Sequence, residues 1–176
     1  KFIKNNLYNE KKIFDLLIKH KITIIIHLAA QAGVRHSLKK PMDYVKNNIV
    51  ATTNLMEASQ KYNGIRHFLL ASTSSVYASS IKMPYSEKDP ADFPLQFYAA
   101  TKRSTELMAH SYSHLYGIPF TILRFFTVYG PYGRPDMSLF KFAKSIENNK
   151  PIFLFNRGNM GRSFTYIDDV VKILSK

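Results

Sequence analysis

The chain has no cysteine among its 176 residues, which excludes disulfide bridges and thiolate metal sites. It also lacks an apolar run of the roughly 20 residues that a membrane-spanning helix requires. The longest apolar stretch, residues 22–30, is interrupted by Thr23 and His27. The first residues do not show the basic end and apolar stretch of a secretory signal peptide. We therefore expect no membrane span and a reducing, cytoplasmic location.

Acidic residues are few: 12 against 25 basic residues, for a net charge of +13. Such a chain suggests an anionic partner, namely nucleic acid, a membrane surface or a phosphorylated small molecule. The lysines are scattered, and they form no stripe with interleaved aromatic residues. We therefore interpret most of them as a solvated surface and expect no nucleic-acid partner. We expect no metal site either, because His110 and His114, four residues apart, have no third ligand beside them.

Helical and strand periodicities alternate along the chain, which predicts an α/β domain with a parallel sheet. Residues 21–28 (KITIIIHL) are rich in β-branched side chains, a pattern typical of a strand buried on both faces. In parallel sheets ligands bind at the carboxyl ends of the strands, so the loops after Leu28, Ser72 and Arg124 should lie side by side. Strands are expected at residues 2–4, 21–28, 67–72, 120–124 and 151–155, and helices at 10–20, 41–62, 97–116, 138–148 and from a cap at Asp168 onward.

One pair of side chains could perform acid–base chemistry. Tyr98 and Lys102 stand four residues apart in a predicted helix and so share one face. A lysine ammonium favours the phenolate and lowers the tyrosine pKa from about 10, so that the tyrosine can act as a general base. Spacing alone is a weak signal, because most Tyr–Lys pairs four residues apart on a helix are ordinary surface pairs.

Two upstream segments favour a catalytic pair over a surface pair at Tyr98 and Lys102. Residues 71–77 (ASTSSVY) place hydroxyls directly after a predicted strand, where they can donate to a substrate oxygen or cap a local turn. Residues 27–33 (HLAAQAG) place small side chains after an earlier strand. Small residues there allow a flat ligand close to the backbone, although a tight packing turn explains them too.

Taken in this order, the segments resemble those of the extended short-chain dehydrogenase/reductases, the NAD-dependent epimerase/dehydratase family. The resemblance covers nearly the whole chain, and it is strongest to UDP-glucuronate 4-epimerases. The segments that carry it are HLAA at 27–30, YVKNN at 44–48, STSS at 72–75, YAATK at 98–102, RFFTVYGP at 124–131, GRPDM at 133–137 and GRSFTYIDD at 161–169.

The resemblance implies a Rossmann-type doubly wound parallel sheet. Residues 1–130 would be a partial NAD-binding domain, and residues 131–176 the beginning of a small substrate-binding region interleaved with it. The seven glycines form neither GxGxxG nor the family's GxxGxxG, so the first βαβ unit with its phosphate loop would be missing. We therefore expect a fragment that by itself binds NAD⁺ weakly and has little activity.

The resemblance also implies roles for three catalytic residues. Tyr98 would take the proton from the sugar 4-hydroxyl, Lys102 would hold the nicotinamide ribose, and Thr73 would hydrogen-bond the same sugar oxygen. Hydride would pass from C4 to NAD⁺ and return to the opposite face of a 4-keto sugar. No acidic residue follows Thr73, which argues against 4,6-dehydration and for 4-epimerisation, most directly of UDP-glucuronate to UDP-galacturonate.

Binding residues follow from the same resemblance. Arg162 would pair with the UDP diphosphate, whereas Ser74, Ser75 and Thr127 would bind the sugar carboxylate, with Arg134 near that end. The residues that would bind the cofactor are Leu28, Ala29, Ala30, Asn47, Tyr98, Lys102 and Phe125.

Other functions remain open at the level of sequence. The substrate could be a UDP-hexose or a UDP-N-acetylhexosamine, and a non-catalytic remnant could serve as a binding module. A basic nucleic-acid binder would show steeply salt-dependent affinity for DNA. Family resemblance further implies a homodimer of the full-length protein, formed through the helices at 41–62 and 97–116.

Overall fold

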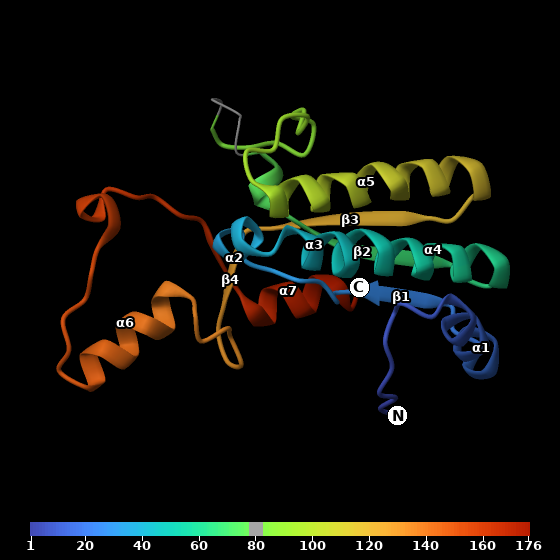
Figure 1. Ribbon diagram of the computed structural model, residues 1–176, viewed down its shortest axis with the longest axis horizontal. Coiled ribbons are helices and arrows are strands. Elements are labelled where there is room, and N and C mark those ends of the chain that lie inside the picture. Colours follow the sequence, from blue (N-terminus) through green and yellow to red (C-terminus); the bar gives the residue numbers. More distant parts are fainter. Residues whose placement is uncertain (78–82) are drawn as a thin grey trace. The chain divides into compact units, whose positions relative to one another are not determined.

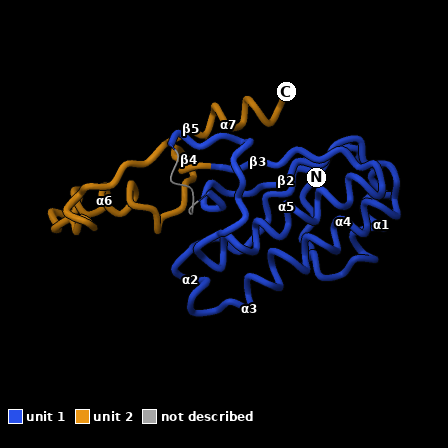
Figure 2. The backbone as a smooth tube through the Cα atoms, turned by 90° about the horizontal axis from the view of Figure 1, so that it is seen from above, with its two compact units in different colours: residues 1–125 blue, residues 126–176 orange. Residues whose placement is uncertain are grey.

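A computed structural model describes residues 1–77 and 83–176 of the chain. By packing, the chain divides into two compact units, residues 1–125 and 126–176, coloured separately in Figure 2. This boundary lies near the division predicted at residue 130, whose functional meaning stays a prediction. The first unit contains α1 (Glu10–His20), β1 (Ile24–His27), α2 (Val34–Lys39), α3 (Pro41–Tyr44), η1 (Val45–Val50), α4 (Ala51–Tyr62), β2 (His67–Thr73), η2 (Ser74–Tyr77), α5 (Phe97–Tyr116) and β3 (Phe120–Phe125).

The first unit is built on a three-stranded parallel sheet in the order β1-β2-β3 (Figure 1). Ile24 lies opposite His67 at the start of the sheet, and Thr73 lies opposite Phe125 at its end. The predicted α/β organisation is therefore confirmed. All three strands point the same way, so their carboxyl ends share one edge of the sheet.

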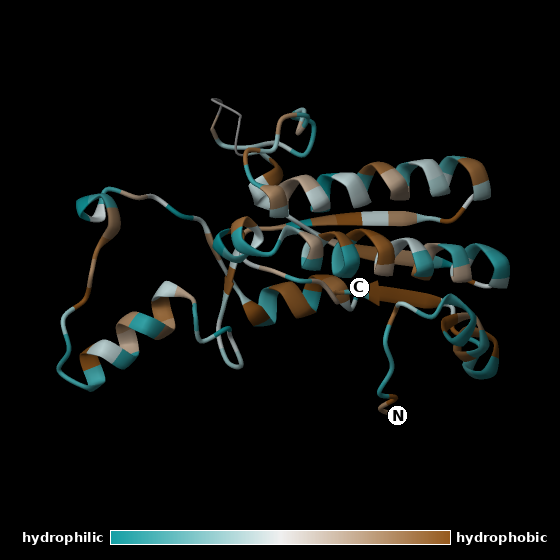
Figure 3. Cartoon of the chain, viewed as in Figure 1, coloured by the Kyte–Doolittle hydropathy of each residue, from teal (hydrophilic) through white to brown (hydrophobic). Residues whose placement is uncertain are grey.

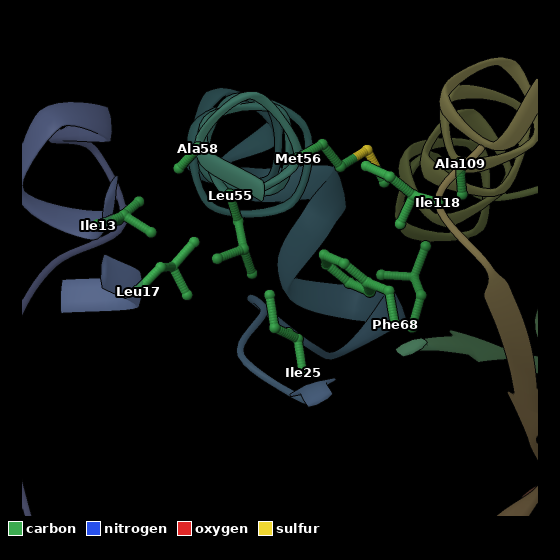
Figure 4. Close-up of a cluster of buried hydrophobic side chains, with 10 residues drawn as sticks. Ile13, Leu17, Ile25, Leu55, Met56, Ala58, Phe68, Ala109 and Ile118 are labelled. Carbon is green, nitrogen blue, oxygen red and sulfur yellow. The ribbon is translucent and has the colours of Figure 1, made fainter. Parts of the chain in front are cut away.

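The hydrophobic core of this unit lies between the sheet and helices α1, α4 and α5 (Figure 4). Ile13 of α1 and Met56 of α4 point into it together with Phe68 of β2, which is fully buried. The Phe68 ring stacks on Phe120 of β3 with 4.7 Å between the ring centroids. Burial of one such side chain stabilises the fold by about 1.5–3 kcal/mol.

Strand β1 differs from the expectation of a strand buried on both faces. Ile24 and Ile26 are 58% and 46% exposed, while Ile25 and His27 between them are buried. Its three isoleucines are all hydrophobic (Figure 3), yet only Ile25 belongs to the core. The core of this unit lies on the Ile25 side of the sheet, which leaves the other face of β1 open.

Several helices match the predicted ranges, with local differences. Residues 41–62 are helical throughout, but the middle portion, η1, is a π-helix between α3 and α4. The short helix α2 was not predicted. Strands were wrongly predicted at residues 2–4 and 151–155, which have no strand structure. A strand needs a neighbour for its backbone groups, and neither segment pairs with another within the described part of the chain.

The second unit contains a two-stranded parallel sheet of β4 (Thr127–Tyr129) and β5 (Phe164–Tyr166), in which Thr127 lies opposite Phe164. These three-residue strands were missed, because they are too short to show a periodicity. The same unit also contains α6 (Ser138–Glu147), η3 (Phe155–Gly158) and α7 (Ile167–Leu174).

The cap predicted at Asp168 is wrong, because Tyr166 precedes α7 as its N-cap. Asp168 lies in the first turn of that helix, where its negative charge interacts favourably with the positive end of the helix dipole. No helix in the described ranges combines the length and apolar character that a membrane crossing would require.

Helix α1 begins with a side-chain cap. The Asn9 side chain accepts a hydrogen bond from the backbone N–H of Lys12 at 3.0 Å. We expect Asn9→Ala to lower the free energy of unfolding by about 1 kcal/mol, because one N–H of the first turn loses its partner. Urea unfolding followed by circular dichroism measures the loss. Asn9→Asp keeps the acceptor and should unfold like the parent chain; equal losses in both variants would contradict the capping role.

Candidate active site

Helix α5 carries Tyr98 and Lys102 one turn apart. The helix is anchored near its start, where the Tyr98 amide donates to Ser37 Oγ of α2 at 3.3 Å. The half-buried Tyr98 ring stands edge-on to the buried Tyr44 ring, with 6.0 Å between the centroids. Lys102 is only 4% exposed, and its Nζ donates to the carbonyl oxygen of Ala71 at 2.8 Å. Lys102 thereby connects α5 to the end of β2.

Burial controls the charge of Lys102. Removal from water lowers the pKa of Lys102 to about 8, although the negative charge of Glu106 opposes the shift. The side chain is therefore largely protonated at neutral pH but deprotonates far more easily than an exposed lysine. A buried ammonium of this kind can favour a neighbouring phenolate.

Thr73 closes β2 beside this lysine contact, two residues after Ala71. It is 8% exposed. Its Oγ1 accepts a hydrogen bond from the Ser75 amide at 3.2 Å and lies 3.3 Å from the Ser75 hydroxyl. Ser74 and Ser75 follow in η2 and are half-buried. The structure thus brings the predicted Thr73, Ser74 and Ser75 to the strand end that Lys102 contacts, with Phe125 opposite Thr73 on β3.

The small-residue turn after β1 is open to solvent. Leu28 is 56% exposed, and Ala29 and Ala30 are exposed as well. The far end of this turn is held by the Tyr44 hydroxyl, which lies 2.6 Å from the carbonyl oxygen of Gly33. The two alanines are therefore accessible, and their own side chains add little bulk.

Asn48 joins that turn to α5. It is 1% exposed, and its Oδ1 accepts from the Gln31 amide at 2.8 Å. Its Nδ2 donates to the Gln31 carbonyl at 3.1 Å and to Thr101 Oγ1 at 3.0 Å. Tyr44 and Asn48 are the ends of the YVKNN segment, but the sequence analysis gave neither residue a role, although their four-residue spacing on a helix could have indicated a shared buried face.

Asn47, the neighbouring residue that was predicted to bind the cofactor, has its side-chain amide bonded to other residues of the chain. Its Oδ1 accepts from the Tyr8 hydroxyl at 2.9 Å, and its Nδ2 donates to the Asp43 carbonyl at 2.7 Å. The amide therefore ties the segment before α1 to the helix at 41–62. Its contact with a cofactor stays a prediction.

Glu106, two turns after Tyr98 on α5, is a buried carboxylate that sequence analysis missed. It accepts hydrogen bonds from Arg124 of β3 (2.8 Å to Oε2), from Arg103 (3.0 Å) and from the Ser72 hydroxyl. Burial alone would raise the pKa of Glu106, but the bonds from Arg124 and Ser72 and the charge of Arg124 outweigh it and lower that pKa. Glu106 and Arg124 are 18 residues apart, so no local spacing could reveal the pair.

Three predicted substrate residues belong to the second unit. Thr127 opens β4, and its amide donates to the Ser163 carbonyl at 3.3 Å. Arg134 pairs with Asp136, with 2.9 Å between Nε and Oδ1, and Arg162 donates to the Gly161 carbonyl at 2.7 Å. Both arginines are exposed, so their planar donors are accessible to an anion.

His27 makes the stability of the first unit depend on pH. Its Nε2 lies 2.8 Å from Thr52 Oγ1, and burial, aided by the charge of Lys102, lowers the pKa of His27 to about 4 from 6.5. Between pH 6.5 and 4 the unfolded chain binds this proton and the folded chain does not, so stability present above pH 6.5 is lost as the pH falls through 4. We expect a loss of about 3 kcal/mol from this group.

Urea unfolding at a series of pH values tests this. His27→Gln cannot titrate, so its stability should fall less between pH 6.5 and 4 than that of the parent chain. Substitution of the exposed His110 by glutamine is the control and should leave the pH dependence unchanged. Identical acid sensitivity of His27→Gln and the parent chain would rule out the role of His27.

The chain is similar in sequence and in structure to known nucleotide-sugar 4-epimerases. The chain is 57% identical over 149 residues to the "Probable UDP-glucuronate 4-epimerase" of Rhizobium meliloti, covering 85% of this chain and 43% of the relative. It superposes on the UDP-glucuronic acid 4-epimerase of Bacillus cereus, solved with UDP-glucuronic acid and NAD, with a TM-score of 0.89 at 39% identity, over 100% of this chain and 56% of that one. The UDP-glucose 4-epimerase of Thermotoga maritima, solved with UDP-glucose, gives a TM-score of 0.91 at 30% identity, over 97% of this chain and 56% of that one.

The chain thus spans about half the length of the relatives it matches. The likeness to the solved epimerases confirms the predicted Rossmann-type α/β fold with parallel sheets. The model of the NAD dependent epimerase/dehydratase family matches residues 1–176. The chain therefore belongs to the NAD-dependent epimerase/dehydratase family.

Proposed function

We propose that this chain supplies the catalytic residues for NAD-dependent 4-epimerisation of a UDP-sugar, with UDP-glucuronate and UDP-galacturonate as the interconverted pair. The observation that carries the proposal is the buried Lys102, one turn after Tyr98 and bonded to the β2 end that carries Thr73. A buried lysine is costly to keep, so its place beside a tyrosine and a threonine at a strand end favours a catalytic role over a surface pair.

The residues present fit NAD. Exposed Ala29 and Ala30 offer a flat approach at the carboxyl end of β1, where ligands of parallel sheets bind. Lys102 offers donors suited to ribose hydroxyls, and Leu28, Asn47 and Phe125 complete the proposed contacts. When bound, NAD⁺ supplies the hydride acceptor for the sugar carbon.

The protein residues then handle the proton and the orientation of the sugar. Tyr98 accepts the proton of the sugar 4-hydroxyl through its phenolate oxygen and later returns it. The Lys102 ammonium favours the phenolate by its positive charge. Thr73 donates to the same sugar oxygen, and its own contacts with Ser75 hold its hydroxyl in place.

Substrate selection rests on uncharged and basic groups. Ser74 and Ser75 follow Thr73 without an acidic side chain, so the site does not repel a sugar carboxylate. We assign Thr127 and Arg134 to the carboxylate end of the sugar and Arg162 to the UDP diphosphate, which its planar donors match. The Rhizobium and Bacillus relatives are named for UDP-glucuronate.

A substrate panel tests the proposal. The complete gene product is incubated with NAD⁺ and, separately, with UDP-glucuronate, UDP-glucose and UDP-N-acetylglucosamine, and the products are identified by proton NMR of the sugar ring. We expect conversion of UDP-glucuronate to UDP-galacturonate at the highest kcat/KM. Turnover of UDP-glucuronate no faster than of the uncharged sugars would reject the assigned substrate.

The second candidate is a UDP-hexose or UDP-N-acetylhexosamine 4-epimerase. The TM-score of 0.91 with the Thermotoga UDP-glucose 4-epimerase favours it as the alternative. The same panel separates the candidates, because the preferred sugar identifies the enzyme. Absence of both turnover and NAD⁺ binding would favour the non-catalytic binding module.

We further propose that the protein acts as a homodimer through the helical segment 41–62, formed by α3, η1 and α4, and through α5. Leu107 and Leu115 expose apolar side chains on α5, at 52% and 66%. Light scattering after size-exclusion chromatography measures the assembly. A monomer at micromolar concentration would contradict the proposal.

A further inference from the structure

Glu106 occupies a position that the proposed reaction does not use directly. Its side chain is 3% exposed, and both carboxylate oxygens are engaged. Oε1 accepts from the Ser72 hydroxyl and from Arg124 Nε at 3.1 Å. Oε2 accepts from Arg124 Nη2 at 2.8 Å and from Arg103 Nη1 at 3.0 Å. One carboxylate therefore holds α5, the end of β2 and the end of β3 together.

The partners of Glu106 stand next to the proposed site in the sequence. Ser72 directly precedes Thr73 and lies opposite Arg124 in the parallel register of β2 and β3. Arg124 directly precedes Phe125. On α5, Glu106 follows Lys102 by one helical turn. A shift of this carboxylate would move both strand ends relative to the helix that carries Tyr98.

The network continues to the far end of η2. Arg124 Nη1 donates to the Tyr77 hydroxyl at 2.7 Å, and the guanidinium lies 4.7 Å from the centre of the Tyr77 ring. Tyr77 in turn stacks on Tyr85 with 5.0 Å between centroids. The segment with Thr73, Ser74 and Ser75 is therefore held at both ends, by Ser72 on Glu106 and by Tyr77 on Arg124.

We propose that Glu106 is a positioning residue, which fixes the Thr73–Ser75 segment against α5 and places its negative charge one helical turn after Lys102. This inference rests on the function proposed above, because it concerns the same site. It differs from a purely structural ion pair in one respect: the charge of Glu106 acts on Lys102 as well as on its own hydrogen-bond partners. The electrostatics agree, since Glu106 raises the pKa of Lys102 against the effect of burial.

Titration of Lys102 in the absence of cofactor and substrate tests whether the negative charge of Glu106 favours the protonated lysine. Lysine labelled with ¹³C at Cε is followed by NMR against pH in the parent chain and in Glu106→Gln, which keeps the shape of the side chain but removes its charge. We expect the Lys102 titration to shift to lower pH in Glu106→Gln. An unshifted titration would overturn the proposal.

The matched control is Asp92→Asn. Asp92 is an exposed carboxylate that accepts from Arg103 Nη2 at 3.1 Å, so its removal perturbs the same arginine without touching Glu106. Its Lys102 titration should coincide with that of the parent chain. A shift as large as that of Glu106→Gln would show that the effect comes from general loss of negative charge and would also overturn the proposal.

A second variant tests whether Glu106 positions the Thr73–Ser75 segment. It also keeps the proposal testable if the Glu106→Gln chain does not fold. Ser72→Ala keeps the ion pairs of Glu106 and removes only its bond to β2. We expect hydrogen exchange of the Ser75 amide, which is bonded to Thr73 Oγ1, to become roughly two- to tenfold faster, as for loss of one hydrogen bond. The Lys102 titration should stay as in the parent chain. Unchanged Ser75 exchange would contradict the positioning role.

Kinetics of the complete gene product separate this inference from the proposed function. With an active epimerase, Ser72→Ala should lower kcat more than it changes KM for the UDP-sugar, because the substrate contacts are kept while their alignment is lost. If the parent protein shows no epimerase activity but the two NMR effects are present, the assigned reaction fails and the positioning role of Glu106 stands. If activity is present and the NMR effects are absent, only the role of Glu106 fails.

Discussion

Tyr98→Phe is expected to lower kcat for epimerisation by about 10²- to 10⁴-fold, the contribution typical of a positioned general base. The substitution removes only the hydroxyl oxygen that would take the sugar proton. The edge-on contact of the ring with Tyr44 is kept, so the fold and the affinity for the UDP-sugar should change little. Steady-state rates with UDP-glucuronate and the thermal unfolding midpoint measure the two effects.

Tyr116→Phe is the matched control, because Tyr116 lies on the same helix and is 46% exposed. It should retain the parent rate. If Tyr98→Phe keeps more than about a tenth of the parent kcat, Tyr98 is not the general base.

Lys102→Met is expected to abolish activity and yet stabilise the chain at neutral pH. Burial lowers the pKa of Lys102 from 10.5 to about 8. Below pH 8, burying the protonated side chain therefore lowers the free energy of unfolding by about 3 kcal/mol. Methionine removes that cost but leaves the Ala71 carbonyl without its bond, which costs about 1–2 kcal/mol. The net expected gain is about 1–2 kcal/mol. A residue that weakens the fold and is retained for chemistry is a common feature of active sites.

The pH dependence provides the sharper test. Between pH 8 and 10.5 the unfolded lysine still holds its proton while the folded one has lost it, so the parent chain gains stability as the pH rises. The advantage of Lys102→Met should therefore shrink over this range. Urea unfolding from pH 7 to 10.5 measures it, with substitution of the exposed Lys46 by methionine as the control. A variant that is less stable than the parent at pH 7 would refute the account of Lys102.

Local sequence determined the elements that carry the proposed site. Helix α5 was predicted over its full range, and Gly117, which was expected to stop it, follows it directly in a left-handed conformation with φ of 67°. Strand β2 was predicted within one residue of its end. Both predictions succeed because backbone propensity and side-chain periodicity act over a few neighbouring residues. The Tyr98–Lys102 spacing belongs to the same class of information.

Pairing between distant segments was beyond the sequence. The strands at β4 and β5 form only because residues 127–129 and 164–166 meet, and each is too short to show an alternation by itself. Conversely, residues 2–4 have strand-like composition and no strand. The exposed face of β1 also depends on which face of the sheet is covered, which its own apolar run does not reveal.

The sequence by itself determined that this chain is an α/β protein with a tyrosine and a lysine on one turn of a helix, downstream of a hydroxyl-rich strand end. Only the tertiary structure showed that Lys102 is buried against Ala71, that Asn48 joins the turn after β1 to α5, and that Glu106 gathers Ser72 and Arg124. The physical reason is the sequence separation of the interacting residues: periodicity depends on residues that are close together along the chain. Burial and hydrogen-bond partners are set by segments that folding brings together.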